Sequence, residues 1–198
     1  MPEAHETMEH AERAEHAASE DRKIALVIAI LALFLSFSEM LGKGAQTGSI
    51  SANVEAANLW AFFQAKTVRM TTVRTAADQL KLQVAGATDP AVKEAMQKQV
   101  DAWLKTAARY ESEPDTHEGR RELAERAKDA QDRSEVLLGQ YHHYEIASAA
   151  FQIGIVLCSA AVITGIIALA WFAGLLGAAG AAVLLLGVFA PHALHHLL

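Results

Sequence analysis

Histidine supplies the clearest chemical signal in this chain of 198 residues, which contains nine histidines. At the carboxyl terminus, His192, His195 and His196 are spaced so that two or three imidazoles share one face of a helix. Imidazole is a common ligand for metal ions. No carboxylate or thiolate lies close by in the sequence, so a polar cap on an apolar helix is the competing interpretation. The pattern makes these three histidines a candidate metal site.

The histidines of the amino-terminal tail, residues 1–23, are arranged differently. His5, His10 and His16 are five and six residues apart, which scatters them around a helix. The segment "HETMEH" also misses the H-E-x-x-H spacing of zinc hydrolases by one residue. Each of these histidines has a glutamate four residues away, so we expect a solvated, amphiphilic, His/Glu-rich tail.

Other catalytic motifs fail the same kind of test. The segment "LGKGAQTGS" lacks the G-K-[ST] ending of a phosphate loop and follows an apolar helix instead of a strand. The single cysteine, Cys158, lies in an apolar run and cannot form an intrachain disulfide. The net charge is −6, with no basic stripe for nucleic acid. We therefore expect no enzyme, no cofactor and no nucleic-acid partner.

Three apolar segments predict transmembrane helices over residues 24–42, 146–172 and 174–190, because about 20 apolar residues cross a bilayer. The 45 residues from Ile146 to Ala190 contain no Asp, Glu, Lys or Arg. We expect the hairpin between the last two helices at Trp171–Gly174. Small residues in the third segment (Gly174, Gly177, Ala178, Gly180 and Ala181) favour close helix packing. The predicted anchors at the membrane interfaces are Tyr141, His142, His143, Tyr144 and Trp171.

The segment between the first two spans, residues 43–145, predicts a coiled-coil-like helical domain, and the fold class is all-α. Apolar residues recur at steps of four and three at positions 52, 56, 59, 63, 66, 70, 73, 77, 80 and 84, and only Lys66 is polar. Asp89-Pro90 predicts the start of a second helix. A third helix follows the turn "SEPDTHEG". A chain that leaves and re-enters the same membrane face through antiparallel helices needs an even number of them, but three helices are predicted here. Either the short middle helix lies obliquely or one long helix is broken.

Two segments carry a family resemblance: "NLWAFFQAK" (Asn58 to Lys66) and "YEIASAAFQIGIVLCSAAVITG" (Tyr144 to Gly165). Together with the His/Glu-rich tail, they resemble the bacterial membrane-protein family DUF4337, a domain of unknown function. The resemblance implies an inner-membrane protein with a helical domain between its spans, and it implies no catalytic residues. The seam and the aromatic segment together predict a partner or oligomer surface formed by Leu59, Trp60, Phe62, Phe63, Lys66 and Met70.

These features favour a non-enzymatic homo-oligomer in the bacterial inner membrane, in which the helical domain mediates assembly or docks a protein partner. The alternative is a channel or transporter subunit, with a metal ion among its candidate substrates. It draws on the histidines and on Gln152, Ser159 and Thr164 in the second span. Basic residues are denser before the first span than after it, which predicts a cytoplasmic amino terminus and a periplasmic helical domain.

Overall fold

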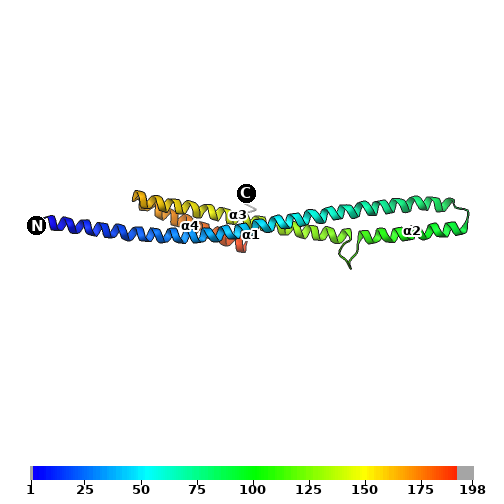
Figure 1. Cartoon of the computed structure of the whole chain (residues 1–198), viewed down its shortest axis with the longest axis horizontal. Coiled ribbons are helices and arrows are strands. Elements are labelled where there is room, and N and C mark those ends of the chain that lie inside the picture. The colour runs from blue at the N-terminus through cyan, green and yellow to red at the C-terminus, as the bar shows by residue number, and fades with distance from the viewer. Residues whose placement is uncertain (1, 191–198) are drawn as a thin grey trace. The chain divides into compact units, whose positions relative to one another are not determined.

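The fold is described from a computed structural model, which defines the backbone of residues 2–190 and the side chains of residues 20–190. This part of the chain consists of four helices without a strand: α1 (Pro2–Gly86), α2 (Pro90–Glu111), α3 (Arg120–Thr164) and α4 (Ile167–Phe189) (Figure 1). The predicted all-α fold is confirmed. Three helical stretches, Glu20–Gly86, Arg120–Thr164 and Ile167–Phe189, contain a segment long and apolar enough to cross a membrane.

The helices form two compact units. We call Met1–Gly48 with Val136–Leu198 the apolar unit, and Ser49–Glu135 the charged unit. Parts of α1 and α3 belong to each unit, α2 belongs to the charged unit and α4 to the apolar unit.

The apolar unit is a bundle of three helical segments whose small residues allow close packing. Leu31 of α1 lies against two glycines. A β-carbon added at Gly154 of α3 would lie 3.1 Å from a Leu31 methyl carbon, and a β-carbon added at Gly177 of α4 would lie 2.5 Å from one. Gly180 faces the ring of Phe151, and a β-carbon added at Gly180 would lie 3.1 Å from that ring. The prediction that glycines serve helix packing is confirmed for Gly177 and Gly180. Gly174 instead faces open space.

The turn between α3 and α4 lies earlier than Trp171–Gly174, where the sequence predicted it. Helix α3 ends at Thr164 and α4 begins at Ile167. Gly165 between them has a φ of +69°, a left-handed conformation that glycine adopts without steric cost. The predicted helix limits 146–172 and 174–190 are therefore wrong at this turn. As a result α4 has 23 residues, enough to cross a hydrocarbon core of about 30 Å.

In the charged unit, α1 packs through the seam that the sequence predicted. Its seam positions are buried or partly buried, whereas the residues between them are mostly exposed. The ten positions are Ala52, Ala56, Leu59, Phe63, Lys66, Met70, Val73, Ala77, Leu80 and Val84. The predicted cap of α2 is also confirmed, because the Asp89 carboxylate accepts a hydrogen bond from the Ala91 N–H at 2.8 Å.

Helices α2 and α3 together form one broken return path along α1 within the charged unit (Figure 1). The Lys66 ammonium lies 5.4 Å from the ring centroid of Tyr110, near the end of α2. The next residue, Thr67, accepts a hydrogen bond from the Arg120 Nε, at the start of α3, at 2.8 Å. The end of α2 and the start of α3 therefore face the same turn of α1, and residues 112–119 loop out between them. Of the two sequence-based alternatives, the broken long helix is confirmed.

Candidate functional site

The predicted partner surface is divided between the inside and the outside of the charged unit. Leu59, Lys66 and Met70 are buried within this chain, which corrects their assignment to a partner or oligomer surface. The reason is the seam spacing, which turns all three toward the return path. Trp60 and Phe63 are partly buried and stack edge to face, with ring centroids 5.4 Å apart, against a cluster that contains Ala56, Leu59, Leu123, Ala127 and Ala130.

Phe62 is the predicted surface residue that stays outside, with 38% of its area exposed. The Lys66 Nζ lies over its ring, 5.6 Å from the ring centroid. The buried ammonium thus lies close to two aromatic rings, those of Phe62 and Tyr110. Cation–π attraction of this kind strengthens when water is excluded.

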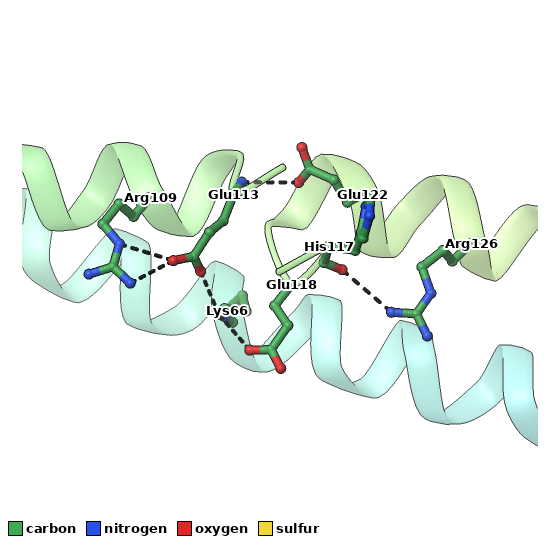
Figure 2. Close-up of polar contacts among 7 residues, drawn as sticks. All are labelled: Lys66, Arg109, Glu113, His117, Glu118, Glu122 and Arg126. Carbon is green, nitrogen blue, oxygen red and sulfur yellow. Dashed lines mark hydrogen bonds and ion pairs between the residues drawn. The ribbon is translucent and has the colours of Figure 1, made fainter. Parts of the chain in front are cut away.

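The loop between α2 and α3 is tied down around Lys66 (Figure 2). The Lys66 Nζ lies 4.0 Å from a carboxylate oxygen of Glu113 and 3.8 Å from one of Glu118. Arg109 donates to the same Glu113 carboxylate from α2. Glu122, at the start of α3, accepts hydrogen bonds from the Ser112 hydroxyl and the Glu113 N–H. We call these residues, with Arg120, the loop clamp.

Arg120 makes the most varied contacts of the loop clamp. Its guanidinium donates to Thr67 and to Glu111, both at 2.8 Å, and lies 4.8 Å from the ring centroid of Phe63. These contacts join α1, α2 and α3 at one point. Sequence reasoning missed Arg120, because nothing in the spacing of "EGRRE" distinguishes it from the exposed Arg121.

Two carboxyl groups of the loop clamp have shifted acidities. The hydrogen bond from Arg109 lowers the pKa of Glu113, and the hydrogen bond from Ser112 lowers the pKa of Glu122. Hydrogen bonds to a carboxylate favour its charged form. Both glutamates are occupied in holding the loop, so the chemistry of this cluster is that of a structural clamp.

The outer face of α1 in the charged unit presents a second regular pattern, which the sequence analysis did not identify. Its residues follow steps of three and four like those of the seam, are all exposed and carry no charge. We call this set the outer stripe: Ser51, Val54, Asn58, Ala61, Ala65, Val68, Thr72, Thr75, Gln79 and Leu82. The signal was present in the sequence, because nine of the ten positions, from Val54 to Leu82, lie two residues beyond a seam position.

The outer stripe is more apolar than its composition suggests. The hydroxyl of Thr72 donates to the Val68 carbonyl at 2.9 Å, and that of the neighbouring Thr71 donates to the Thr67 carbonyl at the same distance. Because each hydroxyl bonds its own helix, its methyl group remains for contact with a partner. Two shallow hollows follow this face, one from Ser51 to Ala65 and one from Thr67 to Gln79.

The predicted interface anchors separate into exposed and buried residues. Trp171 is 78% exposed, His142 is exposed and Tyr141 is partly exposed. His143 and Tyr144, which the sequence also predicted as interface anchors, are only 1% and 5% exposed because they pack within the apolar unit. Neighbouring helices enclose both rings.

Polar contacts accompany this burial. The His143 Nδ1 lies 2.7 Å from the Gly139 carbonyl oxygen, and the Ser38 hydroxyl donates to the Tyr144 carbonyl at 2.8 Å.

The candidate metal ligands His192, His195 and His196 lie outside the described residues. Within the described part, no group of three or more His, Cys, Asp or Glu side chains is arranged to hold a metal ion.

Comparison with known proteins and families places this chain in a family. No curated protein and no solved structure matches this chain. The model of the family described as a domain of unknown function, DUF4337, matches residues 20–190. That range covers the charged unit, most of the apolar unit and all but the start of α1, so this chain belongs to the DUF4337 family.

Proposed function

We propose that this protein is a non-enzymatic, multi-pass protein of the bacterial inner membrane that self-associates through the outer stripe of α1. The apolar unit is the membrane anchor, and the charged unit is the assembly module. The observation that carries the proposal is the outer stripe: ten exposed, uncharged positions with coiled-coil spacing.

The contrast in charge within the charged unit supports this choice of face. Residues 49–86 of α1 include six charged residues among 38, and one of these, Lys66, is buried. Residues 120–135 of α3 include ten charged residues among 16. Depletion of charge is typical of the centre of a protein interface. The return path is suited to water and the outer stripe to a partner.

A second copy of this chain fits the outer stripe for a reason of symmetry. Copies anchored in one membrane share their direction, so a two-fold axis would place two α1 helices in parallel. In a parallel pair each residue of the outer stripe meets its own copy. A charged residue would then repel itself, so self-association requires an uncharged stripe, and this stripe is uncharged from Ser51 to Leu82.

Orientation belongs to the same proposal. Arg13, Arg22 and Lys23 precede the first apolar segment, and Lys43 follows it, which supports a cytoplasmic amino terminus and a periplasmic charged unit. A reporter that is active only in the periplasm should be active when fused after Gly86. Activity of a cytoplasmic reporter at that point instead would reverse the orientation.

Disulfide crosslinking in native membranes tests the self-association. In a Cys158→Ala background, Val68→Cys places one thiol on the outer stripe, where Val68 is 65% exposed. Mild oxidation should link two chains of 21.3 kDa into a covalent dimer. Val92→Cys is the matched control, because Val92 is also exposed, at 44%, but lies on α2.

A charge on the stripe provides the second arm of the test. Val68→Lys places two ammonium groups against each other in the parallel dimer and should convert the detergent-extracted particle to a monomer, whereas Val92→Lys should leave it dimeric. Equal crosslinking at positions 68 and 92, or a wild-type protein that is monomeric at working concentration, would refute self-association through this face.

A further inference from the structure

A groove in the apolar unit lies between the first span of α1 and the beginning of α4. Its apolar wall is formed by Ile24 and Val27 on one side and by Ile167, Ala170, Trp171, Gly174 and Leu175 on the other. Glu20 and Lys23 lie at its α1 edge, and both are exposed. Its volume of about 650 Å³ is within the range of small-molecule sites.

The groove has the polarity of a phospholipid. Its charged residues come immediately before the apolar segment of α1, and its other lining residues are uncharged. If the three helices cross the membrane as proposed above, the charged end is at headgroup depth and the apolar wall faces acyl chains. The exposed Trp171 ring belongs at the same depth, because tryptophan prefers the membrane interface.

We infer that this groove binds a zwitterionic phospholipid whose headgroup carries a phosphate and a primary amine. Lys23 supplies an ammonium for the phosphate, and Glu20 supplies a carboxylate for the amine. One positive and one negative side chain match a headgroup of zero net charge. An anionic phospholipid without an amine would satisfy Lys23 but would leave its phosphate close to an unpartnered carboxylate.

Gly174 makes the inference testable without disturbing the bundle. It lines the groove, and a β-carbon added there would meet no atom within 4 Å. A leucine at this position projects toward the lipid site. Gly44 is the matched control, because it lies in α1 of the same unit, is exposed, and also has no atom within 4 Å of a virtual β-carbon.

The experiment is native mass spectrometry of the full chain in mild detergent, titrated with phosphatidylethanolamine or phosphatidylglycerol. The wild-type protein should retain phosphatidylethanolamine preferentially. Gly174→Leu should weaken that binding by about tenfold, since the loss of even two methylene contacts has an effect of this order. Gly44→Leu should bind like the wild type. The double variant Glu20→Gln/Lys23→Gln should bind the two lipids equally.

The inference rests on the proposed membrane anchor, and the design separates the two. Alkaline washing of membranes tests the anchor itself, and the Val68→Lys monomer tests lipid binding independently of self-association. Equal retention by Gly174→Leu and Gly44→Leu would overturn the groove as the binding site. A wild-type protein that binds phosphatidylglycerol as tightly as phosphatidylethanolamine would overturn the headgroup assignment.

Discussion

Each of the two units of this molecule is stabilised internally in a different way. In the apolar unit, helices approach each other across glycines, so that Leu31 packs against Gly154 and Gly177. In the charged unit, an alanine-rich seam supplies little side-chain volume, and charged side chains fasten the loop where the return path is broken. The stability of the apolar unit is therefore sensitive to added side-chain volume, and that of the charged unit to the loss of side-chain contacts.

The physical reason is the solvent that each unit is suited to. Lipid gives helices no hydrophobic reason to associate, so shape and close packing decide association. In water an alanine seam buries little apolar area, and ion pairs add little at exposed positions but more where they are partly enclosed. Lys66, with 8% of its side chain exposed, is an enclosed example.

The largest effect should come from adding volume to the apolar unit at Gly187. A β-carbon there would lie 2.8 Å from the His143 β-carbon and 2.9 Å from the Tyr144 ring, and neither atom can easily move away. We expect Gly187→Val to destabilise the apolar unit by about 1–3 kcal/mol, the usual cost of overpacking. The buried thiol of Cys158 reports this through a thiol-reactive dye during heating.

Gly44→Val is the control for this substitution, because the added atoms meet open space. It should melt with the wild type while Gly187→Val melts earlier. If both variants release the Cys158 thiol at the wild-type temperature, tight packing does not hold the apolar unit together.

A smaller effect should follow the loss of contacts in the charged unit at Arg120. Arg120→Ala removes the hydrogen bonds to Thr67 and Glu111 and the contact with Phe63. We expect a loss of about 1–2 kcal/mol, the scale of partly exposed hydrogen bonds to charged groups. In a Trp171→Phe background, thermal unfolding followed by the fluorescence of Trp60 and Trp103 reports on the charged unit alone.

Arg126→Ala is the matched arginine substitution on α3, since Arg126 makes one long, exposed hydrogen bond, 3.4 Å to the His117 carbonyl. It should change the unfolding temperature little. An Arg120→Ala variant as stable as Arg126→Ala would remove the loop clamp from the account of what holds the charged unit.

The sequence predicted the repeating parts of this fold and missed the unique ones. The seam from Ala52 to Val84 and the Asp89 cap depend on periodicity and local chemistry, which are visible in any window of the chain. The turn at Gly165 was missed because Trp171 and Gly174 are stronger interface and turn signals, and both lie within α4 instead. The burial of His143 depends on Gly187, a contact that no local window contains.

The candidate site also has one part that the sequence displays and one part that only the fold brings together. The outer stripe follows a period that the sequence already displays. The loop clamp joins Lys66 to Glu113, and Arg120 of the clamp bonds to Thr67, each across about 50 residues, and only the folded hairpin brings these pairs together.

The smallest effect concerns pH and separates the charged unit from the apolar unit once more. The pKa values of Glu113 and Glu122 are lowered by hydrogen bonds from Arg109 and Ser112, respectively. A carboxyl group with a lowered pKa in the folded state stabilises the protein fully above its unfolded pKa, about 4.3 for glutamate. That stabilisation is lost as the pH falls through the lowered folded values. The charged unit should therefore lose thermal stability between about pH 5 and pH 3, whereas the apolar unit, in whose described residues no such clamp occurs, should change less. The double variant Glu113→Gln/Glu122→Gln should start from a lower unfolding temperature at neutral pH and decline less steeply.

Glu125→Gln, which removes one exposed carboxylate on the same helix, should keep the wild-type slope. Parallel pH profiles for the wild type and the double variant would show that the loop clamp contributes no stability through its two glutamates.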